Sequence, residues 1–305
     1  MASERPQGRA APSPPPVGVK ETWDGPAFPC DPLSVAAALA QARAAGVDRL
    51  DAQWILGHLT GRSRAWLLAH DEQSLPASAA GSWPGLLERR ARGEPLAYVL
   101  GRTEFCGLTL QVSPAVLIPR PETEMLVDWA LECLRAAPAQ NFVDLGTGSG
   151  AIALALLHAH PLLQALATDA SADALAVAQA NAQVLGLPLR LAQGDWWSAV
   201  GDARFGLAVS NPPYIACGVP HLPALAHEPG SALSPGGDGL DALRRIVAGA
   251  PAHLLPGAWL LLEHGHDQAE AVRALLSAQG FEVPQTRPDL AGLPRCTGAC
   301  WPAAN

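Results

Sequence analysis

The sequence predicts an α/β protein: a doubly wound, mostly parallel sheet of seven strands, preceded by a small N-terminal helical bundle and a β-hairpin that joins the two. Residues 141–301 alternate between apolar runs of strand length and longer stretches of helical period, the pattern of a parallel sheet with helices on both faces. Residues 32–92 have helical periodicity throughout. Between these parts the apolar period becomes alternating, which indicates paired strands.

Composition limits the class of protein. The chain has 305 residues, 49% of them hydrophobic, which is enough for a substantial core, and a formal net charge of −8. Such an acidic chain is a poor candidate for an enzyme whose affinity rests on phosphate contacts. The longest apolar runs are far shorter than the about 20 residues that cross a bilayer, and the first residues lack the apolar segment of a secretory signal. We expect a cytoplasmic protein with no membrane partner.

Neither the cysteines nor the histidines form a metal-binding pattern. The six cysteines are scattered, and only Cys296 and Cys300 lie near each other, without a second pair to complete a site. His264 and His266 are likewise an isolated pair. We expect these side chains to be structural, the thiols to be reduced and no metal to be bound.

The first part of the chain divides into three segments. Residues 1–30 are rich in Pro, Ala and Gly and predict a disordered tail. Residues 31–95 predict a helical bundle with apolar faces that include Leu33, Leu50 and Trp66, and with a last helix around residues 86–90. Two roles stay open for this bundle: a domain that only adds stability, or a surface that docks a macromolecular substrate. Residues 96–118, with Tyr98 to Gly101 among them, predict a β-hairpin linker.

The sheet domain is expected over residues 119–305. Its first helix can begin at Pro121 or Thr123 and reaches Ala136. The segment 215–238 has no periodicity and is rich in Pro and Gly, and because loops this long in a compact domain are often functional, we expect it to cover the active site. The remaining expected strands are 141–145, 163–168, 187–192, 205–210, 257–263, about 281–284 and 296–301, and the expected helices between them are 151–158, 171–185, 240–253 and 268–279.

A glycine-rich turn and an acidic residue predict a cofactor site. The turn after the first strand consists of small residues, which let the backbone approach a ligand closely. Asp169 ends the second strand 23 residues after Gly146, near the about 20-residue spacing at which an acid meets ribose hydroxyls. This favours an adenosine-bearing cofactor, whereas the G-x-G-x-G spacing weakens the case for NAD. Trp196 and Trp197 follow the third strand, and we expect one of them to pack in the core. The turn is Gly146, Thr147, Gly148, Ser149 and Gly150.

The fourth strand ends in Asn211-Pro212-Pro213-Tyr214. The two prolines stop the strand and hold Asn211 extended at its carboxyl end, where open α/β sheets bind ligands. The side-chain oxygen of Asn211 and the carbonyl of Pro212 are two acceptors that suit a planar –NH2 group, and Tyr214 can stack on that group. A Pro-rich turn alone would need no function, but together with the glycine turn it indicates a site.

These two motifs resemble those of S-adenosylmethionine-dependent amino-group methyltransferases. The stretches 93–98, 118–124 and 260–265, with Glu228-Pro229 and residues 236–241, narrow the resemblance to the release factor glutamine methyltransferase family, also called the HemK family. The resemblance covers about residues 50–300. The chain departs from the family pattern before residue 30, over residues 301–305, and at Ala226-His227.

The resemblance implies a Rossmann-like methyltransferase sheet, S-adenosyl-L-methionine as cofactor and class-1 peptide chain release factors as protein partners. It implies methyl transfer to N5 of the glutamine in their Gly-Gly-Gln motif. From the acidic composition we expect no direct binding of nucleic acid. The implied substrate residues are Asn211, Pro212, Pro213 and Tyr214, of which Asn211, Pro212 and Tyr214 are catalytic. The implied cofactor residues are Gly146, Thr147, Gly148, Ser149, Gly150, Asp169, Trp196 and Asn211.

Two other functions fit the same motifs. A nucleic-acid adenine-N6 or guanine-N2 methyltransferase presents a similar amino group, but it predicts a basic cleft or an added recognition domain, and the acidic composition favours neither. A non-enzymatic scaffold of the translation machinery would bind the cofactor without transferring its methyl group.

Overall fold

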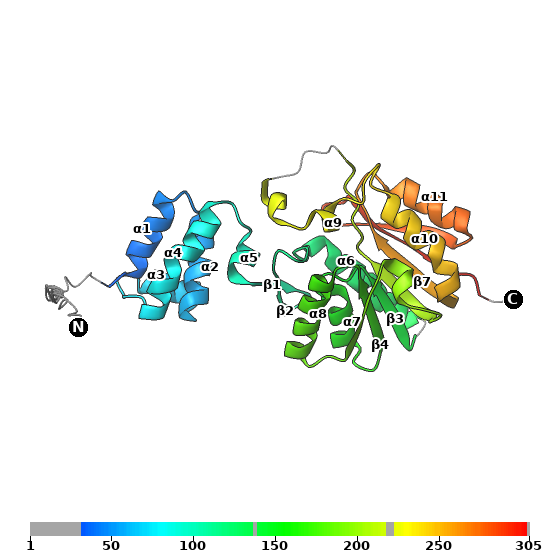
Figure 1. The fold of residues 1–305 in the computed structure, drawn as a ribbon, viewed down its shortest axis with the longest axis horizontal. Coiled ribbons are helices and arrows are strands. Elements are labelled where there is room, and N and C mark those ends of the chain that lie inside the picture. The colour runs from blue at the N-terminus through cyan, green and yellow to red at the C-terminus, as the bar shows by residue number, and fades with distance from the viewer. Residues whose placement is uncertain (1–31, 137–138, 218–222, 304–305) are drawn as a thin grey trace, which may run out of the picture.

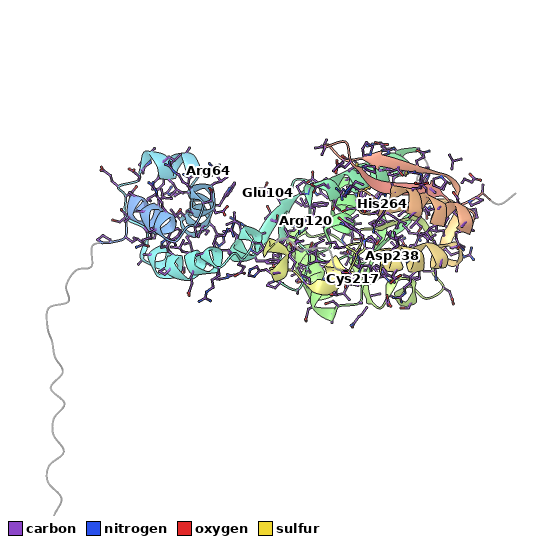
Figure 2. The ribbon with its side chains drawn as sticks, turned by 90° about the horizontal axis from the view of Figure 1, so that it is seen from above. Arg64, Glu104, Arg120, Cys217, Asp238 and His264 are labelled. Carbon is purple, nitrogen blue, oxygen red and sulfur yellow. The ribbon has the colours of Figure 1, made fainter. Side chains whose placement is uncertain are left out.

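The computed structural model describes residues 32–136, 139–217 and 223–303, so the expected disordered tail lies outside the described residues. Figure 1 shows a small bundle of helices and a larger α/β part, joined by a short helix and a hairpin. Figure 2 shows Arg64 on the helical bundle, His264 in the α/β part, and Glu104 and Arg120 between the two.

The N-terminal bundle has a small apolar core of its own. Ile55, Leu56, Leu67 and Trp83 are completely buried in it. The last helix is nine residues longer at its start than expected, because Trp83 and the residues around it pack on the bundle even though Pro84 lies inside the helix. The four helices are α1 (Val35–Ala44), α2 (Arg49–Thr60), α3 (Arg64–Ala69) and α4 (Ala77–Ala91).

The joining segment corrects one expectation. Tyr98 to Gly101 were expected to belong to the β-hairpin, but Leu96–Leu100 form a short helix, α5, which ends at Gly101 with a left-handed φ of 70°. Two hydrogen bonds of Tyr98 hold this helical turn in place. Its side-chain hydroxyl donates to the carbonyl of Val116 at 2.6 Å, and its backbone carbonyl accepts from the Arg89 guanidinium at 2.9 Å. The hairpin follows as expected, with β1 (Arg102–Phe105) paired antiparallel to β2 (Leu108–Gln111).

The expected seven-stranded sheet is confirmed among the described residues. Its order is β5-β4-β3-β6-β7-β9-β8, with β3 to β7 parallel to one another and β9 running antiparallel to both of its neighbours. The strand order reverses between β3 and β6, which is where such sheets bind ligands. The strands are β3 (Asn141–Leu145), β4 (Gln164–Asp169), β5 (Leu189–Gln193), β6 (Phe205–Ser210), β7 (Leu254–Glu263), β8 (Glu282–Pro288) and β9 (Pro294–Cys300).

Helices cover both faces of the sheet, so its central strands are apolar on both sides. On β3, Phe142 packs under one helical layer and Val143 under the other, as their alternating directions require. The first layer contains α6 (Pro121–Ala136), α7 (Ala151–Ala159) and α8 (Ala172–Leu185), and the second contains α10 (Asp241–His253) and α11 (Ala269–Gln279), as Figure 1 shows.

Short helices occur where the sequence showed no periodicity. They are a 3-10 helix η2 (Pro223–His227) and the single turn α9 (Gly230–Leu233), and a further 3-10 helix η1 (Trp196–Ala199) follows β5. No helix in the described ranges is long and apolar enough to cross a membrane. The same residues contain no group of three or more His, Cys, Asp or Glu arranged to hold a metal ion.

Candidate active site

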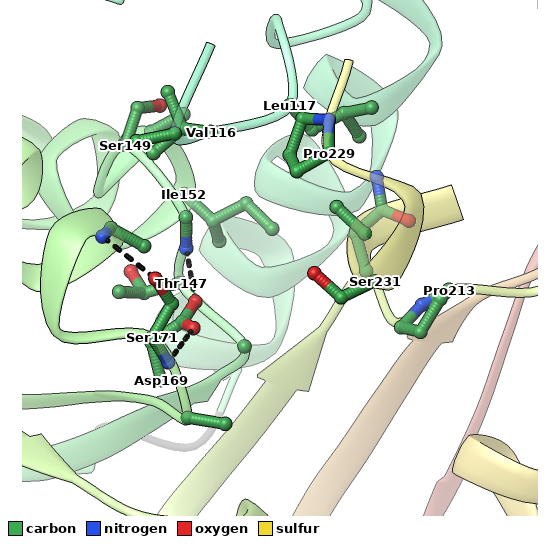
Figure 3. Close-up of a pocket in the computed structure, with 18 of the residues that line it drawn as sticks. Val116, Leu117, Thr147, Ser149, Ile152, Asp169, Ser171, Pro213, Pro229 and Ser231 are labelled. Atoms are coloured by element: carbon green, nitrogen blue, oxygen red, sulfur yellow. Dashed lines mark hydrogen bonds between the residues drawn. The ribbon is translucent and has the colours of Figure 1, made fainter. Parts of the chain in front are cut away.

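A cavity of about 410 Å³ lies at the carboxyl ends of the central strands. Its walls come from the glycine turn after β3, the ends of β4 and β6, the start of η1 and the loop that contains α9. Figure 3 shows Thr147, Asp169 and Ser171 on one side of it, and Pro213, Pro229 and Ser231 on the other. The sequence-predicted residues in the wall are Gly146, Thr147, Gly148, Ser149, Asp169, Trp196, Asn211 and Pro213.

Both the backbone conformation at position 146 and the adjacent Trp196 ring favour glycine there. The φ of Gly146 is +74°, and a Cβ there would lie 2.9 Å from Cζ3 of Trp196. Gly150 was expected to hold the cofactor but is not part of the wall. A Cβ on Gly150 would instead meet Leu154 at 3.1 Å and Ala178 at 3.3 Å, so this glycine allows α7 and α8 to pack closely.

The Asp169 carboxylate is held in a fixed orientation at the end of β4. One oxygen accepts a hydrogen bond from the backbone N–H of Gly148, and the other accepts one from Ser171, both at 2.9 Å (Figure 3). Each carboxylate oxygen has a second lone pair. Asp169 can therefore also accept hydrogen bonds from hydroxyl groups of a ligand in the cavity.

Asp144 supports the glycine turn from below and is completely buried. Its Oδ2 accepts from the Thr147 hydroxyl at 2.7 Å and from the N–H of Ala153 at 3.3 Å. Its Oδ1 has no partner among the described residues. Burial raises the pKa of Asp144 from 3.8 to about 7, against the opposing effect of these two hydrogen bonds.

The hairpin is fastened to the same turn by Asn181 of α8. Its side-chain oxygen accepts from the N–H of Gln111 at 2.6 Å, and its NH2 group donates to the carbonyls of Gln111 and Ser149. Asn181 is 1% exposed. A buried amide with its donors and acceptor satisfied fixes neighbouring elements relative to one another.

The two tryptophans divide as expected. Trp196 lies in the cavity wall and adopts a left-handed φ of 52°, a conformation that L-residues rarely hold. Trp197 is buried in the core, where its indole N–H donates to the carbonyl of Ile246 at 2.7 Å and its ring stacks on His253. The left-handed turn at Trp196 is what sends these adjacent side chains to different places.

The Asn211–Tyr214 motif contributes only part of itself to the cavity wall. Asn211 is partly buried, and its Nδ2 donates to the Thr123 hydroxyl at 3.0 Å. Its Oδ1 has no hydrogen-bond partner among the residues that the structure describes. Pro212 is buried, and neither Pro212 nor Tyr214 belongs to the wall of this cavity. Tyr214 instead points its hydroxyl to Glu263, at 3.3 Å from Oε1.

Two polar residues next to the Asn211–Tyr214 motif were not predicted as site residues, namely Thr123 at the start of α6 and Glu263 at the end of β7. Thr123 lines the cavity, and Glu263 is 1% exposed. Burial raises the pKa of Glu263 to about 7. Both residues lie in stretches that carried the family resemblance, but partners so distant in sequence could be recognised only once the fold was known.

A buried ion pair holds the loop that closes the other side of the cavity. The side chain of Glu228 is 1% exposed and pairs with Arg120 at 2.5 Å. Its second oxygen accepts from the N–H of Ile118 at 3.3 Å. The residues after Glu228, beginning with Pro229, line the cavity. This ion pair therefore anchors the loop to the segment that enters α6.

Comparisons with known proteins agree with this geometry. Residues 34–101 match the family model described as PrmC N-terminal domain, and residues 123–238 match the one described as methyltransferase small domain. The release factor glutamine methyltransferase of Bordetella pertussis is 50% identical over 256 residues, which are 83% of this chain and 95% of that protein. The Xylella fastidiosa (strain Temecula1) protein of the same name is 51% identical over 267 residues, which are 86% and 97% of the two chains.

Two solved structures share the fold. The Thermus thermophilus 16S rRNA N2 G1207 methyltransferase RsmC, in complex with AdoMet and guanosine, has a TM-score of 0.50 at 20% identity over 66% of this chain and 49% of that chain. The catalytic domain of human Mettl16 has a TM-score of 0.53 at 17% identity over 72% of this chain and 82% of that chain. At such identities the likeness concerns the fold alone.

Proposed function

Because this chain belongs to the release factor glutamine methyltransferase family, and so is a methyltransferase, we propose that it methylates N5 of the glutamine in the Gly-Gly-Gln motif of class-1 peptide chain release factors. S-adenosyl-L-methionine is the proposed methyl donor. The observation that carries the proposal is the position of Asn211. Its side chain reaches the same cavity as the glycine turn and Asp169, with its NH2 group engaged by Thr123.

The cavity suits an adenosine-bearing cofactor. Gly146 leaves room beside the Trp196 ring, where any larger residue would collide, and an aromatic ring in a wall offers a flat apolar surface for a base. The fixed carboxylate of Asp169 offers acceptors for ribose hydroxyls. When bound, S-adenosyl-L-methionine supplies a methyl group made electrophilic by its positively charged sulfur. We propose that Gly146–Gly150, Asp169, Trp196 and Asn211 hold it, with Gly150 acting through helix packing.

The chain's own contribution to the reaction is to orient and activate an amide nitrogen. That nitrogen is a weak nucleophile, because its lone pair is delocalised into the carbonyl group. In the proposed complex, Oδ1 of Asn211 and the carbonyl of Pro212 accept its two hydrogens. The amide is thereby positioned, and the positive charge that develops on nitrogen during transfer is stabilised by two preorganised acceptors. Pro213 and Tyr214 complete the proposed contacts with the glutamine side chain, and the surplus proton leaves to water.

For the N-terminal bundle, residues 31–95, we propose a docking role toward the release factor. It presents large apolar side chains to solvent, with Leu50 42%, Trp54 49% and Leu68 48% exposed. Two guanidinium groups lie over tryptophan rings on the same bundle, Arg64 over Trp54 and Arg62 over Trp66. Apolar and aromatic groups exposed together are typical of protein-binding surfaces. Residues 96–118 then form the proposed linker to the methyltransferase domain, residues 119–305.

A labelled-methyl assay tests the proposed reaction. Purified enzyme and labelled S-adenosyl-L-methionine are incubated with a class-1 release factor, with the same factor carrying Asn in place of the motif glutamine, and with duplex and single-stranded nucleic acid. We expect label only in the unmodified release factor. Label in nucleic acid would support the rival methyltransferase function, and cofactor binding without transfer to any of these would support the scaffold.

A further inference from the structure

Thr123 and Glu263 each contact the Asn211–Tyr214 motif and keep one unused hydrogen-bonding group among the described residues. The Thr123 hydroxyl accepts from Nδ2 of Asn211 at 3.0 Å, and its own hydrogen has no acceptor in hydrogen-bond geometry among the described residues. The buried Oε2 of Glu263 has no donor among the same residues, while its Oε1 accepts from the Tyr214 hydroxyl at 3.3 Å. The Thr123 hydroxyl is close enough to Glu263 to lower the pKa of that carboxyl group.

A threonine hydroxyl has one hydrogen to donate, which makes its hydrogen bonds directional. If Thr123 donates to the Glu263 carboxylate, it can only accept from Asn211, so the Asn211 NH2 group must face Thr123. The carboxamide oxygen is then left for the ligand. In the reverse arrangement a protonated Glu263 donates to Thr123, and Thr123 donates to the Asn211 oxygen. The NH2 group of Asn211 would then face the NH2 group of the substrate, donor against donor.

We propose that Glu263, as a carboxylate, is a positioning residue that orients the Asn211 carboxamide through the Thr123 hydroxyl and so selects an amide as substrate. The inference deepens the proposed function and rests on it where the substrate is concerned. The orientation of Asn211 is a property of the enzyme alone and can be measured without any methyl transfer.

Burial and the neighbouring charges together set the pKa of Glu263 at about 7. Burial is the main cause that raises its pKa to about 7, and Glu122 of α6 acts in the same direction. Thr123, Arg295 of β9 and the Tyr214 hydroxyl act against it. The neighbouring titratable groups are His264, whose pKa burial lowers, and Cys296, which pairs with Glu263 across the β7–β9 register and whose pKa burial raises. Glu263 is therefore the group of this cluster expected to titrate near neutrality, and the oriented form of Asn211 prevails above that pH.

Nuclear magnetic resonance of the side-chain amide of Asn211 tests the orientation directly. The full-length enzyme, labelled with 15N in its Asn residues and free of substrate, is titrated from pH 5.5 to pH 8.5, and the Asn211 signal is assigned by its loss in Asn211→Asp. We expect the two amide proton shifts to move with one midpoint near pH 7. The titration should vanish in Glu263→Gln and in Thr123→Val, and persist in Thr123→Ser. No titration in the unchanged enzyme, or one that survives Glu263→Gln, would overturn the proposal.

Kinetics supply the second readout. With the release factor as substrate, kcat should rise with pH to a plateau above about pH 7, as Glu263 ionises. Val has nearly the same shape as Thr, so Thr123→Val should lower kcat by up to about 100-fold, the effect of a misplaced reacting group, with little change in KM for S-adenosyl-L-methionine. The rise of kcat that follows the ionisation of Glu263 should be lost, and any rise that remains near pH 7 would come from Asp144. Thr123→Ser should restore both kcat and the rise that follows Glu263. If the enzyme never methylates the release factor, the proposed function is refuted, but the amide titration still tests the orienting contacts from Glu263 through Thr123 to Asn211. If Thr123→Val has an unchanged kcat and pH profile, only the orienting role of Glu263 and Thr123 is refuted.

Discussion

Replacing Gly146 by Ala separates the two demands that the structure places on this glycine. The new Cβ would lie 2.9 Å from Cζ3 of Trp196, at a residue whose φ is +74°. Gly186, at the end of α8, has a φ of +66°, and no atom lies within 4 Å of the position that a Cβ would take there. Gly186→Ala therefore carries the backbone strain without the collision and is the matched control.

The expected losses of stability and of cofactor affinity follow from the positive φ and from the 2.9 Å approach to Trp196. A left-handed conformation costs an L-residue about 1–2 kcal/mol, and Ala recovers about 0.4–1 kcal/mol of that by restricting the unfolded chain. Both variants should lose roughly 1 kcal/mol of unfolding free energy, which lowers the Tm of a domain this size by about 2–4 °C. Only in Gly146→Ala must the Trp196 ring retreat, by more than about half an ångström, because carbon atoms in contact lie about 3.5–4.0 Å apart. A lost aromatic contact of about 0.5–1.5 kcal/mol weakens cofactor binding roughly two- to tenfold.

Isothermal titration of S-adenosyl-L-methionine into each variant gives the affinity, and thermal unfolding without ligand gives the stability. We expect similar Tm values for the two variants and a raised Kd in Gly146→Ala alone. Equal Kd values in Gly146→Ala and the unchanged protein would refute the assignment of this wall to the cofactor. A raised Kd in Gly186→Ala would show that backbone strain, rather than the displaced ring, affects binding.

Three further predictions concern other parts of the site. Asn211→Ala removes one of the two proposed acceptors and should lower kcat by about 10²–10³-fold with a nearly unchanged Tm; near-normal turnover in the labelled-methyl assay would contradict the proposed role. Arg120→Ala leaves the Glu228 carboxylate buried without its cation and should cost about 1–3 kcal/mol in urea unfolding, less than for a fully buried pair because Arg120 is partly exposed, while adding Glu228→Gln should recover part of the loss. Burial raises the pKa of Asp144 to about 7 in the folded protein, from 3.8, so the folded state holds a proton that the unfolded state has released, and the free energy of unfolding falls as pH rises from about 4 to 7. Asp144→Asn should make this decrease in unfolding free energy smaller. Urea unfolding at pH 4.5 and pH 8 measures it, and the same difference between the two pH values in Asp144→Asn and in the unchanged protein would show the expectation to be wrong.

The elements that could be predicted from the sequence are those with strong local signals. β3 and β6 have the expected bounds, since each is a short apolar run followed at once by a glycine turn or by prolines. The errors arose where local signals conflict with packing. Pro84 concealed the first half of α4, and the apolar residues around Tyr98 have the composition of a strand but form the single turn α5.

In the candidate site, too, local sequence signals predicted some residues, whereas contacts between distant segments were not predicted. Eight predicted residues lie in the cavity wall, because motif spacing and strand ends bring them to one edge of the sheet, whereas the wall residues from the 115–119 segment, the start of α7 and the α9 loop were not predicted as site residues. The supporting partners of the eight were not predicted either. Asp144 was not predicted as a site residue, and the pairing of Thr123 with Asn211 joins residues 88 positions apart. Nothing in the sequence near either residue indicates such a contact, since a hydrogen bond between distant segments depends on how the whole sheet is assembled.

The start of α6 is where these supporting contacts converge. Thr123 holds the Asn211 carboxamide, and Arg120, just before the helix, holds the loop through Glu228. The chain reaches this point from the N-terminal bundle by way of the hairpin, which Asn181 fastens to the glycine turn. One short stretch thus contacts the proposed amide-binding residue Asn211, the loop that holds Glu228 and the connection to the proposed docking domain. A displacement of the bundle on binding a protein would act first on this stretch, so substitutions at Arg120 should alter KM for the release factor more than KM for S-adenosyl-L-methionine, and equal changes in the two KM values would exclude that coupling.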